Sequence, residues 1–120
     1  HCTAAGKAML SQFTDEEVEA IVADAGLVRK TENTITDLDA LLDELADVRE
    51  RGFALDNEER IEGTRGVGAP VSTDDSSSPV GAVAICGPPT RVAGDRFRSE
   101  LPEMVRQTAK VIEVNLTYRE

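Results

Sequence analysis

Aromatic residues are scarce in this 120-residue sequence, which has no tryptophan, one tyrosine and three phenylalanines. Hydrophobic residues nevertheless make up 40% of the chain, and most of them are alanine, valine, leucine or isoleucine. A chain of this length can enclose one aliphatic core but is too short for two ordinary domains. The lack of aromatic rings also argues against binding nucleic acid by stacking on its bases.

Positive charge is sparse as well. Thirteen lysines and arginines face 23 acidic residues, which gives a formal net charge of -10, and only three of the cations are lysines. Such a surface repels phosphate groups, whereas a DNA-binding face needs clustered lysine and arginine. We therefore expect no DNA-binding surface on this segment. The repulsion among these negative charges is screened by dissolved salt. Together with the depletion of lysine, the high negative charge indicates a halophilic, salt-adapted protein.

The sequence has two cysteines, Cys2 and Cys86, and one histidine, His1. This set lacks the spacing of a zinc site and is too small for a disulfide framework, so we predict no metal and no cofactor. No hydrophobic run approaches the roughly 20 residues that cross a bilayer, and the chain does not begin with a basic segment leading into an apolar one. These features predict a cytoplasmic protein with no membrane partner.

Helical signals dominate the first half of the sequence. A first helix is predicted over Thr3–Phe13, with Thr3 as its cap. Gly6 lies in the first turn, where glycine costs about 1 kcal/mol relative to alanine, so we expect another group to approach the backbone there. The predicted apolar face of this helix consists of Ala5, Ala8 and Met9.

Two further helices follow. The residues Thr14 to Glu17 fit a capping box, and the helix after them should end at Gly26. The connector from Leu27 to Thr34 is expected to be locally extended. Thr36 is the predicted cap of a third helix that stops at Gly52. The apolar residues of that helix recur at helical spacing: Leu38, Leu41, Leu42, Leu45 and Val48.

Short segments rich in valine, alanine and isoleucine then predict strands at 53–56, 66–71 and 80–86. The polar residues 72–78 join the last two strands as a turn, to which we assign no function. This order of helices followed by antiparallel strands indicates the α+β class. A sheet of three strands would leave edges that need covering or pairing.

The chain returns to helical character from Gly94 to Tyr118, where Pro102 should break or restart the helix. One stripe of this helix is predicted to lie on the sheet: Val105, Ala109, Ile112 and Leu116.

Several segments, taken in order, resemble the C-terminal effector domain of IclR-type transcription regulators. They are HCTAAGKA at the start, TITDLDALLDELADVRERGFALDNEE, GTRGVGAPV and VGAVAICGP. The resemblance implies a profilin- or GAF-like fold, an antiparallel sheet with flanking helices, that binds a small organic effector. It also implies that residues 1–120 are a partial domain, whose first strands and winged helix-turn-helix DNA-binding domain precede His1. DNA would be a partner only through that missing N-terminal domain, and the family implies a homodimer or homotetramer.

By motif, the resemblance places the effector pocket between the TAAGKA segment and the sheet. Small residues at a helix N-terminus let free amides approach a carboxylate, so we expect a small carboxylate effector. Family members that bind 2-oxo acids carry more thiol and hydroxyl groups on the strands, which favours a larger or more apolar acid here. The expected ligand-binding residues are Thr3, Ala4, Ala5, Gly6, Asp56, Gly66, Ala84 and Cys86.

Other interpretations remain open for the same residues. The chain could be a small hydrolase or isomerase that uses Asp56 or Cys86, or a ligand-free dimerisation module. Asp56 could also be a solvated strand end. Glu58 and Glu59 are expected to be surface residues. Because the only histidine lies at the chain end, Cys86 lacks a base and is better interpreted as a buried small hydrophobe. We therefore predict no catalytic residues and no enzyme.

Overall fold

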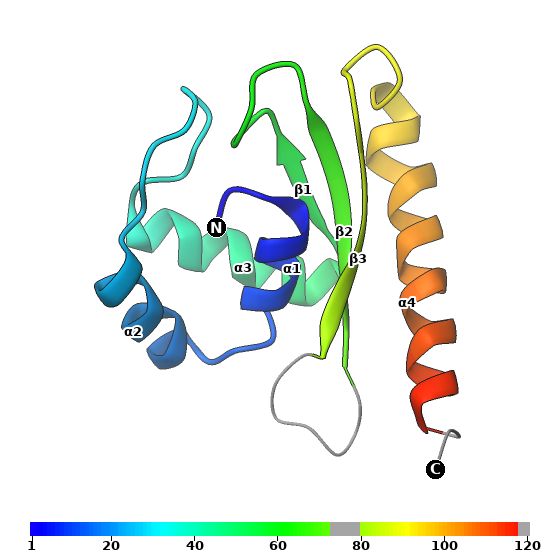
Figure 1. Cartoon of the computed structure of the whole chain (residues 1–120), viewed down its shortest axis with the longest axis horizontal. Helices are drawn as coiled ribbons and strands as arrows, with labels where there is room; N and C mark the ends of the chain where they lie inside the picture. The colour runs from blue at the N-terminus through cyan, green and yellow to red at the C-terminus, as the bar shows by residue number, and fades with distance from the viewer. Residues whose placement is uncertain (73–79, 118–120) are drawn as a thin grey trace.

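The computed structural model describes residues 1–72 and 80–117, and it has helices on both faces of an antiparallel sheet (Figure 1). The predicted α+β order is confirmed. Helices come first, then strands, then a terminal helix preceded by a π-helical turn. The elements are α1 (Ala4–Leu10), α2 (Asp15–Ala25), α3 (Leu38–Arg51), β1 (Ala54–Asn57), β2 (Arg65–Val71), β3 (Gly81–Gly87), η1 (Arg96–Glu100) and α4 (Leu101–Thr117).

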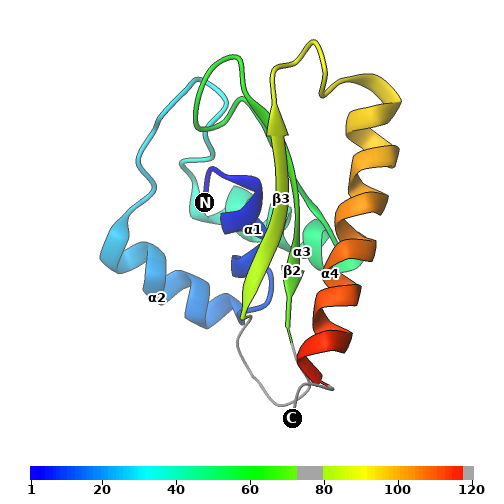
Figure 2. The ribbon, with the colours of Figure 1, turned by 45° about the vertical axis from the view of Figure 1, so that its right-hand side comes forward.

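The sheet formed by these residues has the order β1-β2-β3, with antiparallel pairs. One row of register partners runs Asp56, Gly66, Cys86 across the three strands, and the next row runs Ala54, Gly68, Ala84. Because side chains alternate along a strand, the six positions share one face of the sheet. Helix α1 covers this face and α4 covers the opposite one (Figure 2).

The larger hydrophobic core lies between the sheet and α4. Val105 and Ala109 are buried in it as predicted, and Leu116 packs at its edge, whereas Ile112 is 36% exposed. The residues of β2 that face α4 are Val67, Ala69 and Val71.

The helix at the C-terminal end begins with an irregular turn before Pro102. The N–H of Leu101 donates to the carbonyl of Arg96, five residues back, in η1. Pro102 has no N–H to donate, and the wider turn places it near the start of the regular helix α4, where that loss is tolerated. The helix is thus continued through Pro102 with a change of hydrogen-bonding pattern just before it.

The first helix differs from its prediction in both length and buried face. It ends at Leu10 rather than Phe13. Its buried side chains are Ala4, Lys7, Ala8 and the following Ser11, whereas Met9 is exposed. These residues are spaced as one face of a helix requires. The face of α1 that packs on the sheet therefore includes a lysine and a serine.

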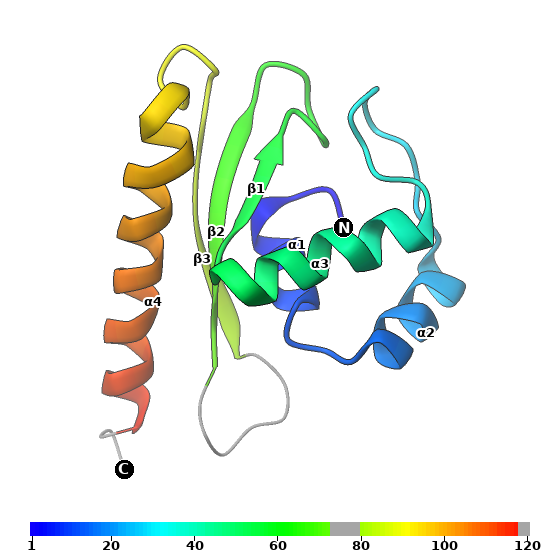
Figure 3. The same cartoon turned by 180° about the vertical axis from the view of Figure 1, so that it is seen from behind.

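The cap of α3 also corrects the sequence prediction. Asp37, not Thr36, caps α3, because its carboxylate accepts a hydrogen bond from the N–H of Ala40 at 3.2 Å. The segment from Leu27 to Thr34 contains no strand. Leu41 and Leu45 of α3 pack with Val18 of α2 in a separate core. Helices α2 and α3 lie on the side of the molecule away from α4 (Figure 3).

Within the described ranges, no helix has the length and apolar character needed to cross a membrane. The polar turn predicted at 72–78 lies outside the described residues, apart from Ser72.

Candidate functional site

Two glycines of β2 let the first turn of α1 rest directly on the sheet. A Cβ atom at Gly68 would lie 2.8 Å from the carbonyl carbon of Ala4 and 3.1 Å from the amide nitrogen of Ala5. A Cβ atom at Gly66 would lie 3.4 Å from the Ala4 Cβ and 3.1 Å from the Sγ of Cys86. The backbone of α1 therefore approaches the strand where glycine leaves room for it.

Thr3 caps α1 as predicted. Its hydroxyl oxygen accepts a hydrogen bond from the N–H of Gly6 at 2.9 Å. A Cβ at Gly6 would lie 2.8 Å from that same oxygen, so the group that approaches Gly6 is the cap itself. The cap occupies the amide of Gly6, which leaves the amides of Ala4 and Ala5 among the helix-start donors that have no partner within the helix.

Asp56 is buried, with 5% of its surface exposed, so it is not a solvated strand end. One carboxylate oxygen accepts a hydrogen bond from the N–H of Glu59 at 2.8 Å, which closes the turn after β1. Burial raises the pKa of Asp56, and this effect outweighs the hydrogen bond and the nearby charges of Lys7 and Arg60. Asp56 thus lies beside Gly66 on the α1 face but already has a structural role.

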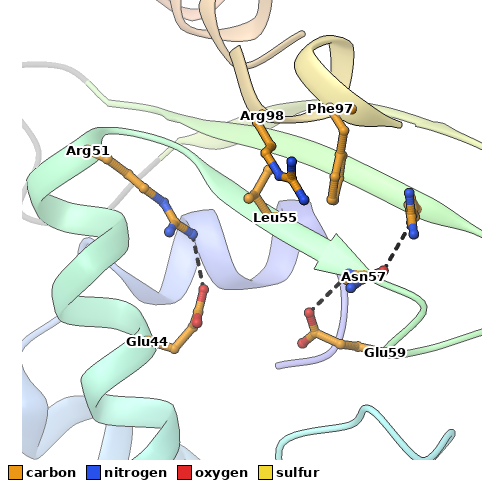
Figure 4. Close-up of a pocket in the computed structure, with 9 residues that line it drawn as sticks. Glu44, Arg51, Leu55, Asn57, Glu59, Phe97 and Arg98 are labelled. Carbon is orange, nitrogen blue, oxygen red and sulfur yellow. Dashed lines mark hydrogen bonds and ion pairs between the residues drawn. The ribbon is translucent and has the colours of Figure 1, made fainter. Parts of the chain in front are cut away.

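A buried ion pair between Lys7 and Glu59 fastens α1 to the end of β1, and the sequence analysis missed it. The Nζ of Lys7 lies 2.9 and 2.8 Å from the two carboxylate oxygens of Glu59, and the two residues are 1% and 7% exposed. Glu44 of α3 lies 3.8 Å from the same Nζ and also pairs with Arg51 (Figure 4). Glu59 is therefore not the surface residue that we expected.

The connector between α2 and α3 is hydrogen-bonded to the β1–β2 turn, which contains Glu59 and follows Asp56. The hydroxyl of Thr31 donates to the carbonyl of Glu58 at 2.5 Å, and the hydroxyl of Thr34 donates to the carbonyl of Glu59. Both threonines are buried. The turn between β1 and β2 is thereby fixed from outside the sheet, which positions Asp56 and Glu59 under α1.

The α1 face of the sheet has a closed part and an open part. Ala4, Asp56 and Gly66 are buried, whereas Ala84 and Cys86 on the edge strand β3 are exposed. Thr3, Ala5 and Gly6 lie between these extremes. The structure thus brings the sequence-predicted positions together around the first turn of α1, with the accessible ones toward β3.

Cys86 is exposed rather than buried, which corrects the sequence interpretation. Its pKa is nevertheless raised, first by partial desolvation and then by the negative charge of Asp56. A raised pKa keeps the thiol protonated at neutral pH and disfavours nucleophilic attack. Among the described residues, no group of three or more potential metal ligands is found.

The raised pKa of Asp56 predicts a pH-dependent stability. A carboxyl group whose pKa is higher in the folded than in the unfolded protein stabilises the fold fully at a pH below the unfolded-state pKa. This stabilisation is lost as the pH rises through the folded-state pKa. Asp56→Asn keeps the oxygen that accepts the Glu59 amide but cannot ionise. The variant should therefore gain stability relative to the parent as pH rises from 4 to 7, as measured by urea unfolding. Parallel pH curves for the two proteins would contradict this account.

Comparison with known proteins gives a consistent assignment. Residues 1–114 match the family model described as the bacterial transcriptional regulator IclR C-terminal domain. The chain is 42% identical over 116 residues to the HTH-type transcriptional repressor AllR of Salmonella paratyphi A, which covers 97% of this chain and 42% of AllR. It is 36% identical over 118 residues to the probable HTH-type regulator ArcR of Halobacterium salinarum, covering 97% and 44% of the two chains. The chain thus spans less than half the length of these relatives.

Solved structures give the same result. The Thermotoga maritima IclR superposes with a TM-score of 0.89 at 32% identity, covering 98% of this chain and 47% of that one. The inducer-binding domain of the PobR transcription factor from Acinetobacter, a double mutant in complex with 3-hydroxybenzoic acid, gives a TM-score of 0.86 at 27% identity, covering 94% and 64%. The chain belongs to the family of IclR C-terminal domains, the effector-binding domains of bacterial transcription regulators.

Proposed function

We propose that this chain binds a small organic acid on the α1 face of the sheet. The acid lies over Ala84 and Cys86, and its carboxylate is received at the first turn of α1 near Ala5. The observation that carries the proposal is the clustering of the sequence-predicted positions around that turn, with an accessible part toward β3. Free amides and the positive end of the helix dipole favour a carboxylate there.

The chemistry of the open part favours an acid with an apolar body. Ala84 offers only a methyl group, and the thiol of Cys86 is a weak donor. The related PobR domain was solved with 3-hydroxybenzoic acid, an aromatic acid. An aromatic or similarly sized carboxylate therefore suits this face better than a small polar one.

The role of the bound acid is regulatory rather than catalytic. The raised pKa of Cys86 counts against a nucleophile, and Asp56 already accepts the Glu59 amide. Effector binding would shift a conformational or oligomeric equilibrium that an N-terminal winged helix-turn-helix domain reads out on DNA. The relatives named as HTH-type regulators support this arrangement, and a homodimer or homotetramer in the cytoplasm would fit it.

Adaptation to high salt is part of the proposal as well. The net charge of -10 and the three lysines support it, and one relative at 36% identity comes from Halobacterium salinarum. Screening of that charge by salt would stabilise the compact state.

The substitution Ala84→Trp tests the proposed effector position. The residue is exposed, so a tryptophan should fill the open part of the face without disturbing the core. Calorimetric titration with a panel of carboxylic acids that includes 3-hydroxybenzoate should detect binding to the parent chain and at least a tenfold loss of affinity in the variant.

Val111→Trp is the matched control, because Val111 is exposed on the outer side of α4, away from this face. It should bind like the parent. The effector position would be wrong if no acid bound, or if Ala84→Trp bound as tightly as Val111→Trp.

A further inference from the structure

A cavity of about 350 Å³ lies beside β1, between α3 and the start of the C-terminal helix, and it is separate from the positions assigned to the effector. Figure 4 shows its lining side chains, which come from α3, β1, the β1–β2 turn, the start of β2 and η1. Leu55 and the buried ring of Phe97 provide its apolar wall. A cavity of this size is within the range that holds small organic molecules.

Three arginines line this cavity in a protein of net charge -10: Arg51, Arg65 and Arg98. The cavity also contains two acids, but each already faces a cation. Glu59 pairs with Lys7, and Glu44 pairs with Arg51. With Lys7, which lies outside the lining, counted as the partner of Glu59, the positive charges of Arg65 and Arg98 have no acidic partner in the cavity.

The hydrogen-bonding capacity of these arginines is incompletely used. Arg65 donates from Nε to the side-chain oxygen of Asn57 at 3.0 Å and from Nη1 to the carbonyl of Val92 at 3.1 Å, and its guanidinium lies 5.3 Å from the Phe97 ring centre. These contacts fix Arg65 in place and leave its Nη2 without a partner among the described residues. The side chain of Arg98 is exposed and has no ion pair or hydrogen bond to the same residues.

We propose that this cavity is a second binding site, for a small organic anion with an apolar body. Its carboxylate is held by Arg98 and the free edge of Arg65, because a guanidinium matches the geometry of a carboxylate. Its apolar part lies against Leu55 and Phe97. This site is independent of the effector position proposed at Ala84, which lies on the other face of the sheet.

Nuclear magnetic resonance titration of the full chain with benzoate tests the site. Benzoate should cause saturable shifts of the backbone amides of Leu55, Asn57 and Phe97. Benzamide, which has the same ring but no charge, should bind at least tenfold more weakly. Arg98→Gln should weaken benzoate binding at these amides by tenfold or more, since it removes a charge-assisted contact from an exposed side chain.

Lys30→Gln is the control for net charge, because Lys30 is exposed and lies outside the cavity. It should leave the benzoate affinity that the cavity amides report unchanged. The proposal is overturned if the cavity amides do not shift, if only amides near Ala5 and Ala84 shift, or if Arg98→Gln and Lys30→Gln weaken binding equally. Because the two sites report through different amides, failure of one leaves the other testable.

Discussion

Replacing Lys7 with methionine is expected to lower the free energy of unfolding by about 3–5 kcal/mol, because it leaves the carboxylate of Glu59 buried without its partner. Methionine has a similar length and fills the same space, so little packing is lost. The cost comes from the uncompensated charge of Glu59, which is 7% exposed. In the parent protein both of its carboxylate oxygens accept hydrogen bonds from the Nζ of Lys7. Urea unfolding followed by circular dichroism measures the change.

Two further variants separate the ion pair from general effects of charge. Lys30→Met removes an exposed lysine and should change the free energy of unfolding by no more than about 0.5 kcal/mol. Adding Glu59→Gln to Lys7→Met removes the stranded charge while keeping an acceptor for the Asn57 amide. The double variant should therefore recover part of the loss. Equal losses for Lys7→Met and Lys30→Met would contradict the ion pair, and so would a double variant with purely additive losses.

This ion pair also shows why part of the site could not be predicted from the sequence. Lys7 and Glu59 are 52 residues apart, and no local pattern links a helix start to the turn after a strand. The sequence contains one signal for the burial of Lys7. This lysine lies on the same helical face as the small residues Ala4 and Ala8, so a helix that buries those alanines also buries Lys7. The consequence for Glu59 follows only once the helix is docked on the sheet.

Local hydrophobic periodicity, in contrast, was sufficient to predict the type and approximate range of most helices and strands. The leucines of α3 and the valines of β2 are spaced as buried faces of a helix and a strand require, and both elements lie close to their predicted ranges. Apart from the buried face of α1, the errors in these elements lie at their ends, where side-chain contacts decide. Asp37 rather than Thr36 caps α3 because its carboxylate is the group that accepts the amide of Ala40.

The positions around the first turn of α1 were predictable from motif order, but their accessibility was not. Asp56 and Cys86 occupy the same row of the sheet, on opposite sides of Gly66. Asp56 is buried because the β1–β2 turn folds back over it, and Cys86 is exposed because β3 is an edge strand in the described sheet. Which member of such a row faces solvent depends on tertiary packing that a strand pattern does not contain.

The close approach of α1 to the sheet gives the second large prediction. Gly68→Ala should lower the free energy of unfolding by about 1–3 kcal/mol, as expected for an added methyl group in a well-packed contact. The new Cβ would meet three backbone atoms of Ala4 and Ala5 at 2.8 to 3.1 Å, and backbone atoms of a docked helix cannot rotate away. The helix would have to lift from the strand, which would also displace the amides near Ala5.

Two other glycines provide a graded comparison within the same sheet. At Gly66 the nearest atom is the Sγ of Cys86 at 3.1 Å, which a side-chain rotation can move, so Gly66→Ala should cost less than Gly68→Ala. At Gly81 nothing lies within 4 Å, so alanine should be neutral or stabilising by a few tenths of a kcal/mol, since it restricts the unfolded chain. Urea unfolding should rank the three variants in this order. Equal effects at Gly68 and Gly81 would mean that α1 does not depend on direct contact with β2, and the proposed effector position beside Ala5 would lose its structural basis.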